Sequence, residues 1–389
     1  MSNKVIQPAS ITINTINIPT TSLRAYTMVF ALVAVWIIFA YATNGIFLEA
    51  RNFSNLIRQT SVTGMLAVGM LMVIVTRQVD LSVGSLVGLT GGIAAIVQGW
   101  LGLGLVPSLA AGVIVGLAIG ALQGGLVAYA NIPAFIVTLG GLLAWRGVIK
   151  GISKGKTIPI GLRSFKAIGQ DYLTPAVGVT IAILAIVVVV IMVIRRNRTR
   201  RQHGLVTANL LTTFAHITIP SLFIIAFIAA LNSYAGMPIP VIIFFSIALL
   251  GVFITQNTVF GRYLYAIGGN PDAARLSGVK LNRHILAVFC IMGALAGVAG
   301  TVYTARVGSA SPDAGQLLEL DAIAACVIGG ASLMGGRGTI FGACLGALFM
   351  ASLDNGMSLK NVPDFTQDIV KGAILVIAVG FDMLSRRKS

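Results

Sequence analysis

The sequence predicts an all-α protein that crosses a membrane many times. Of its 389 residues, 57% are hydrophobic and only 10% are charged, a composition that excludes ordinary soluble proteins. Apolar runs long enough to cross about 30 Å of hydrocarbon recur from one end of the chain to the other. Because lipid offers the backbone no hydrogen-bond partner, such continuous runs are expected to be helices.

About twelve transmembrane helices are expected. Residues 1–24 are polar, lack a signal-peptide cleavage pattern and are expected to stay in the cytoplasm. Two apolar runs, 322–336 and 339–353, are short and rich in glycine, so they are candidates for broken or re-entrant helices. In order, the expected spans are 26–42, 57–76, 83–99, 105–129, 132–150, 175–194, 210–231, 239–256, 285–305, 322–336, 339–353 and 366–384.

These spans fall into three groups. Residues 25–174 form a first transmembrane half, and residues 233–389 form a second. Residues 175–232 have no counterpart in the other half and are interpreted as an inserted helical hairpin. The expected architecture is therefore a core of ten helices plus this hairpin.

Short motifs suggest that the two halves are repeats. Residues 81–85 resemble residues 305–309, Gly120 and its neighbours resemble Gly346 and its neighbours, and residues 131–135 resemble residues 361–365. In the expected topology the matching segments lie on opposite sides of the membrane, so the repeat is inverted, as in many transporters. Glycines spaced four residues apart are expected to let helices pack closely. They are Gly112, Gly116, Gly120, Gly124, Gly293, Gly297, Gly342 and Gly346.

Basic residues between the spans predict the orientation. The densest cluster, residues 195–201, contains five arginines and is expected in the cytoplasm. An even number of spans then places both termini and the polar segment 257–284 there too. The net charge of +16 needs no nucleic acid, because anionic membrane lipid is a sufficient partner.

One loop breaks the orientation rule. Residues 151–174 are expected outside the cell, yet this loop and its edge are basic. One hypothesis is that these residues dock an acidic face of a partner protein; the alternative is that they bind lipid headgroups or keep the loop soluble. They are Lys150, Lys154, Lys156, Arg163 and Lys166.

The segment 257–284 contains the signals for a very short helix. Asn270 can cap it, Pro271 and Asp272 suit its first turn, and Gly278 can end it. Because joining two spans requires no such helix, we expect it to touch a partner, although an ordinary solvated loop is the alternative.

The sequence contains no pattern that predicts a catalytic, metal or cofactor site. Residues 150–157 only partly match a phosphate-binding loop, and no span was expected to carry an embedded carboxylate. Asp368 and Lys371 were expected to pair along one helix face. A neutral solute could pass along polar uncharged side chains, and Gln123, Thr138 and Asn355 are the candidates.

Five segments resemble the permeases of bacterial monosaccharide ATP-binding-cassette (ABC) importers of the ribose, xylose and arabinose type. They are residues 80–84, 133–139, 261–278, 319–325 and 327–330. The resemblance covers roughly residues 45–384, and the hairpin together with residues 351–358 is most similar to the D-xylose branch.

The resemblance implies a permease dimer in the bacterial inner membrane, served by a separate ABC ATPase and a periplasmic sugar-binding protein. The capped segment is then expected to contact the ATPase through Gly269, Asn270, Asp272, Ala273, Arg275, Leu276 and Gly278. Two alternatives are a permease for branched-chain amino acids and a stand-alone secondary carrier. A zwitterionic substrate is expected to need charged residues along its path, and the expected spans show none.

Overall fold

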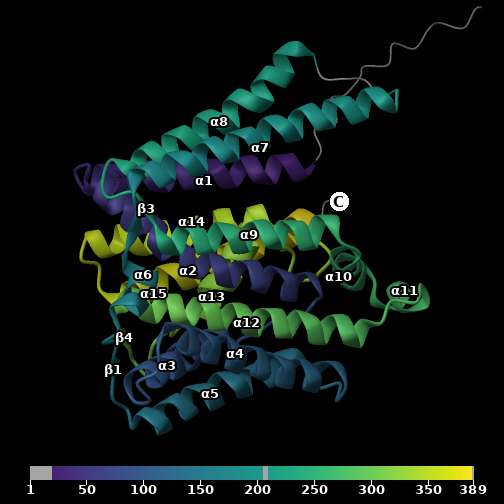
Figure 1. The fold of residues 1–389 in the computed structure, drawn as a ribbon. Helices are drawn as coiled ribbons and strands as arrows, with labels where there is room; N and C mark the ends of the chain where they lie inside the picture. Colours follow the sequence, from purple (N-terminus) through teal and green to yellow (C-terminus); the bar gives the residue numbers. More distant parts are fainter. Residues whose placement is uncertain (1–19, 205–208, 388–389) are drawn as a thin grey trace, which may run out of the picture.

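The computed structural model describes residues 20–204 and 209–387 of the chain. Residues 1–19 of the expected N-terminal segment and the last residue of the basic cluster at 386–388 lie outside this part. The fold is helical, with four two-residue strands at one end of the helix bundle (Figure 1). The strands pair antiparallel, β1 (Ile158–Pro159) with β4 (Ser309–Ala310) and β2 (Tyr172–Leu173) with β3 (Met237–Pro238).

The first half of the chain forms five long helices and two short ones. Pro133 and Pro363 lie just before two of the protein's helices, where a missing N–H costs nothing. The elements are α1 (Thr20–Ala42), the 3-10 turn η1 (Ile46–Leu48), α2 (Ala50–Val75), α3 (Val83–Gly99), α4 (Leu105–Ala128), α5 (Ala134–Ser153) and α6 (Arg163–Gln170).

The inserted hairpin and the second half follow. Side-chain caps from Asn209, Thr258 and Thr339 begin three of these helices. The elements are α7 (Pro175–Gln202), α8 (Leu210–Asn232), α9 (Ile239–Asn257), α10 (Val259–Gly269), α11 (Pro271–Leu276), α12 (Leu281–Val307), α13 (Leu318–Ile328), α14 (Ile340–Leu359) and α15 (Asp364–Arg387).

The count of twelve full spans is not confirmed. In the described residues, eight helices are long and apolar enough to cross a membrane: α2, α4, α5, α7, α8, α9, α12 and α14. Residues 322–336 do not form a full span but fit the alternative of a broken helix, because α13 has 11 residues and ends at a glycine turn in which Gly330 has φ 88°. Its neighbour is longer than expected, since α14 is a regular helix of 20 residues.

Two helices begin inside the protein rather than at its surface. After α2 the chain runs without helix through residues 76–82 and then enters α3; after α12 it runs through residues 308–317 and then enters α13. A Cβ atom built on Gly84 would collide with the carboxylate of Glu319 and the carbonyl of Gly315. The first turns of the two broken segments therefore lie against each other, and only glycine allows that approach.

The helices that precede these breaks run in opposite directions. At one end, Arg58 near the start of α2 donates a hydrogen bond of 2.8 Å to the carbonyl of Gly169. Gly169 in turn packs on the backbone of Arg306, so the start of α2 lies near the end of α12. At the other end, Arg77 just after α2 donates to the carbonyl of Gly268, shortly before α11 and the start of α12.

Equivalent contacts surround each broken segment. Helix α4 packs on α12 and α3, while α14 packs on α2 and α13; α5 packs on α3, and α15 on α13. Asn131 and Asn361 hold the same left-handed conformation, with φ 54° and 51°, before α5 and α15. The other two sequence matches do not lie at equivalent places in the two halves. Residues 81–85 begin α3, whereas residues 305–309 end α12. Gly120 faces α12, whereas Gly346 faces α13.

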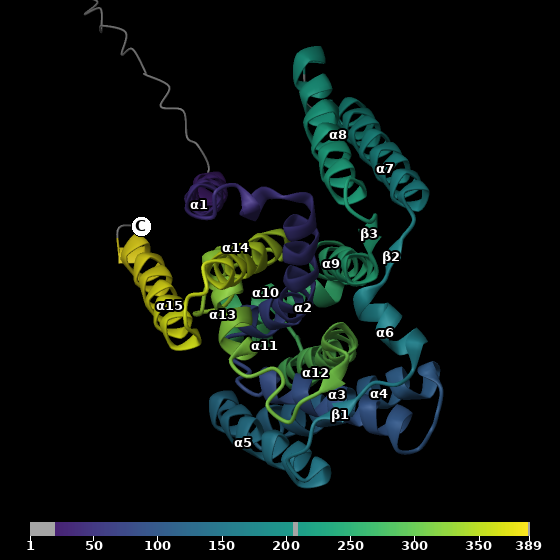
Figure 2. The same ribbon diagram turned by 90° about the vertical axis from the view of Figure 1, so that its left-hand side faces the viewer.

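The hairpin lies at the edge of the bundle. Helices α7 and α8 pack mainly on each other (Figures 1 and 2). They meet the core through Phe227 of α8, whose ring contacts Phe53 and Phe245. The free end of the hairpin, where α7 ends and α8 begins, points the same way as α11, away from the strands (Figure 1).

The glycines expected to pack helices lie at two interfaces. One interface joins α4 and α12, where Gly293 and Gly297 of α12 pack against glycines of α4. The α4 glycines that face α12 are Gly112, Gly116, Gly120 and Gly124. Gly342 and Gly346 of α14 lie against the carbonyls of Gly329 and Ala325. Backbones come close at both interfaces because no side chain separates them.

Replacing Gly116 with alanine is expected to destabilise the protein by about 1–3 kcal/mol, the usual cost of overpacking a core. The added Cβ would collide with the carbonyl oxygen of Gly293. Gly125 in the same helix has open space around its Cα, so Gly125→Ala is the matched control. Thermal unfolding in detergent measures the difference, and equal midpoints for the two variants would contradict this close packing.

Candidate functional site

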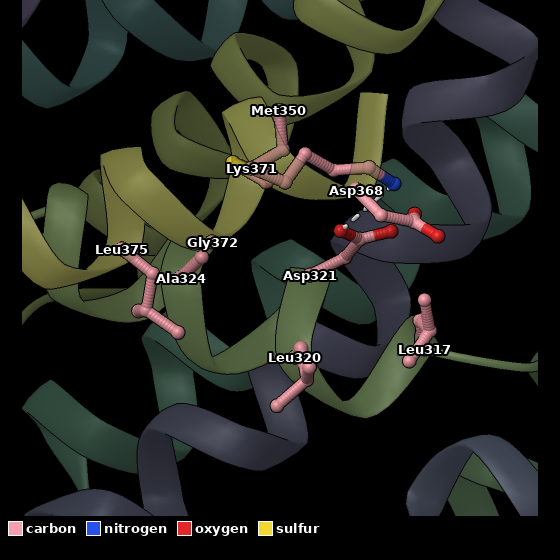
Figure 3. A pocket seen from close by; sticks show the side chains of 9 residues that line it. All are labelled: Leu317, Leu320, Asp321, Ala324, Met350, Asp368, Lys371, Gly372 and Leu375. Carbon is pink, nitrogen blue, oxygen red and sulfur yellow. Dashed lines mark hydrogen bonds and ion pairs between the residues drawn. The ribbon is translucent and has the colours of Figure 1, made fainter. Parts of the chain in front are cut away.

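A cavity lined by charged residues lies between α13, α14 and α15. It measures about 230 Å³, and Figure 3 shows the side chains that line it. One side is apolar, and Asp321, Asp368 and Lys371 line the other. The apolar lining consists of Leu317, Leu320, Ala324, Met350, Gly372 and Leu375.

Lys371 links three helices in the wall of this cavity. Its Nζ atom on α15 lies 3.4 Å from a carboxylate oxygen of Asp321 on α13 and 3.0 Å from one of Asp354 on α14. The side chain of Lys371 is 19% exposed and that of Asp321 only 9%. Because two carboxylates share one ammonium group, the cluster keeps an excess of acceptors that can bind hydroxyl groups.

Two expectations are corrected here. The expected pair between Lys371 and Asp368 is wrong. Asp368 lines the same cavity, but the ammonium group of Lys371 pairs with Asp321 (Figure 3) and with Asp354. Embedded carboxylates are also present, because Asp80, Glu319 and Asp321 are all buried.

A second polar cluster surrounds the start of α3. A carboxylate oxygen of Asp80 accepts hydrogen bonds from the backbone N–H and the hydroxyl of Ser82, at 2.8 and 2.6 Å. Arg146 on α5 donates to the carbonyls of Pro312 and Ala314 and so holds the second broken segment in place. A buried oxygen of Glu319 lies beside Gly84 and forms no hydrogen bond within the described residues.

The three candidate path residues do not form one site. Gln123 is hydrogen-bonded to Ser82 at 3.0 Å, and Thr138 donates to the carbonyl of Ala134 in its own helix. Asn355 lies elsewhere in the fold, where it accepts a hydrogen bond of 2.8 Å from Asn52. All three are buried, and each of them has a partner within the chain.

The short helix α11 lies at the end of the bundle opposite the strands (Figure 1). The side chain of Asn270 accepts hydrogen bonds from the N–H groups of Asp272 and Ala273, both at 3.1 Å. Ala274 is buried in a small cluster with three other apolar residues, whereas the side chain of Leu276 is 90% exposed. The other residues expected at this surface, Gly269, Ala273, Arg275 and Gly278, are also exposed.

The basic loop lies at the opposite end, around β1 and α6. Lys150 pairs with Asp313 at 2.7 Å, and Arg163 pairs with Asp171 at 3.1 Å. The Lys150 ammonium lowers the pKa of the Asp313 carboxyl, so this pair persists as the pH falls toward the usual aspartate pKa and is lost below it. Lys154, Lys156 and Lys166 form no ion pair in the described structure.

Sequence reasoning missed the buried charges because it treated each apolar run as one uniform span. The available signal was the placement of charged residues just before short apolar runs, at Asp80 and Glu319. Such a pattern is typical of discontinuous membrane helices, whose first turns meet inside the protein.

Comparison with known proteins identifies the family. The family described as "Branched-chain amino acid transport system / permease component" matches residues 52–379. The chain belongs to this permease family. The eight apolar helices accord with this assignment, so this permease is a multi-pass membrane protein.

Named relatives cover the permease almost completely. The xylose transport system permease protein of Haemophilus influenzae is 46% identical over 94% of this chain and 98% of its own length. The protein of the same name from Escherichia coli K12 is 45% identical over 95% and 94%. The ribose import permease protein of Escherichia coli K12 is 35% identical over 86% and 87%. No solved structure matches the permease.

Proposed function

We propose that the chain is the permease subunit of an ABC importer for D-xylose in the bacterial inner membrane. Identity of 45–46% to xylose permeases along nearly the whole of both chains carries the proposal. In this assignment the protein is not an enzyme. ATP is hydrolysed by a partner ATPase, and a periplasmic binding protein delivers the sugar.

The geometry supports contact with the ATPase at one end of the helix bundle and with the binding protein at the other. Helix α11 is a rigid, capped element with an exposed apolar side chain, as expected of a part that seats in an ATPase groove. The basic loop lies at the other end, where a binding protein would dock. In this proposal both termini, the arginines at 195–201 and the segment 257–284 lie in the cytoplasm. The position of α11 and the free end of the hairpin at the same end of the bundle supports that orientation.

The path for the sugar is proposed to pass the charged cavity rather than the three amides and hydroxyls named from the sequence. Carboxylate and ammonium groups bind sugar hydroxyls well, and apolar side chains suit the faces of a sugar ring. The opposite directions of α2–α5 and α12–α15 support an inverted repeat of two gates around one path. Two copies of the permease, in contact with membrane lipid, would form the complete transporter.

Reconstitution in liposomes tests this function. The permease is combined with the ABC ATPase and the sugar-binding protein of the same importer, ATP is enclosed in the vesicles, and uptake of labelled sugars is measured. D-Xylose is expected to accumulate and to stimulate ATP hydrolysis. If ribose or leucine is taken up in preference to D-xylose, the proposed substrate is wrong. Uptake without the ATPase would indicate a secondary carrier.

Neutralising Lys154, Lys156 and Lys166 is expected to weaken capture of the binding protein several-fold at low salt. Charge complementarity mainly raises the association rate, and salt screens it over about 8–10 Å. Transport rate is measured against binding-protein concentration at two ionic strengths, and the maximal rate should stay the same. The control removes Arg195, Arg198 and Arg201 at the other end; an equal half-saturation point in all variants would exclude docking at this loop.

A further inference from the structure

The free end of the α7–α8 hairpin concentrates positive charge without a carboxylate to balance it. Residues 195–201 contain five arginines, and the sequence has no acidic residue between Asp171 and Asp272. None of the five forms an ion pair within the described part of the chain. Arginines left uncompensated beside a hydrophobic helix pair create a positive potential that attracts anions.

A small cavity of about 50 Å³ lies between the two helices at this end. Helix α7 contributes Arg196, Asn197 and Arg200, and α8 contributes Thr213 and His216. Asn197 donates a hydrogen bond of 3.1 Å to the hydroxyl of Thr213, which ties the two helices together at the cavity. Residues with two guanidinium groups, an amide, a hydroxyl and an imidazole therefore line this one cavity.

The depth of the cavity matches the boundary of a bilayer. Helix α7 begins at Pro175 and carries no charge until Arg195. Twenty helical residues rise about 30 Å, which is the thickness of the hydrocarbon layer. The arginines of the cavity consequently lie at the level of the lipid headgroups, directly beyond the apolar part of the hairpin.

We propose that this cavity binds the phosphate of an anionic glycerophospholipid. Arg196 and Arg200 can each donate two parallel hydrogen bonds to phosphate oxygens, a geometry that guanidinium groups favour. Exposed apolar side chains next to the cavity offer a surface for the acyl chains: Ile194 is 57% exposed, Leu211 77% and Phe214 61%. These side chains favour a lipid over free phosphate, which has no apolar part.

Lipid titration of the purified protein tests this site. Thermal unfolding in a neutral detergent is followed while phosphatidylglycerol, phosphatidylcholine or inorganic phosphate is added. Phosphatidylglycerol is expected to raise the unfolding midpoint at lower concentration than the other two. Arg196→Ala with Arg200→Ala should weaken its apparent affinity at least about tenfold, since charge-assisted hydrogen bonds are lost.

Matched variants separate a defined site from diffuse attraction. Arg195→Ala with Arg198→Ala removes the same charge from residues that do not line the cavity, and should change the affinity a few-fold at most. Arg196→Lys with Arg200→Lys keeps the charge but not the paired hydrogen bonds, and should restore the affinity only in part. Equal losses in both alanine pairs, or no preference for phosphatidylglycerol over phosphatidylcholine, would overturn the proposal. Inorganic phosphate that stabilises as well as the lipid would overturn its lipid specificity.

Discussion

Replacing Ala273 with arginine is expected to abolish sugar-stimulated ATP hydrolysis while the protein remains folded and inserted. Ala273 is exposed on α11, three residues before the exposed Leu276, so both side chains lie on one face of the short helix. A bulky charged group there would prevent α11 from seating in an apolar groove of the ATPase. A central contact of this kind is worth about 2 kcal/mol or more, or roughly thirtyfold in affinity.

Co-purification of the ATPase and its activity in proteoliposomes measure this effect. Ala274→Arg is the contrasting variant, because Ala274 is buried against the bundle and its replacement should impair folding itself. Leu276→Ala should weaken coupling without adding charge. Full coupling in Ala273→Arg would exclude α11 as the ATPase contact.

Replacing Lys371 with methionine is expected to destabilise the permease by about 3–5 kcal/mol and to stop transport. The change leaves the buried Asp321 and the half-buried Asp354 without the positive charge that they share. Breaking a buried ion pair, as between Lys371 and Asp321, costs about this much. Thermal unfolding measures the stability, and xylose uptake in proteoliposomes measures transport.

Neutral variants distinguish the structural role of this cluster from a role in the path. Adding Asp321→Asn and Asp354→Asn to Lys371→Met removes the uncompensated charges, so the unfolding midpoint should recover. Transport should remain low if the cavity contacts the sugar. Lys360→Met, at an exposed position on the neighbouring turn, is the control. An unchanged midpoint in Lys371→Met would contradict the bridge between α13, α14 and α15.

The short helix α11 illustrates what local chemistry can predict. Its cap, its first turn and its end are specified by four residues within the short stretch 270–278, and the structure places a helix there from Pro271 to Leu276. The long apolar helices were predictable for a similar reason, because hydrophobic length alone decides whether a segment can cross lipid. The ion pairs of Lys371 were not predictable, since Asp321 and Asp354 reach it only through the packing of three helices.

The sequence by itself determined that this protein is a helical membrane protein with a capped polar helix at one end, because hydropathy and capping act over a few neighbouring residues. Only the tertiary structure decided that α3 and α13 begin inside the bundle and that charged residues line a cavity there. A buried charge is tolerated where a distant partner compensates it, and that partner is fixed by how the helices pack. The hydrophobicity of one segment carries no information about such a partner.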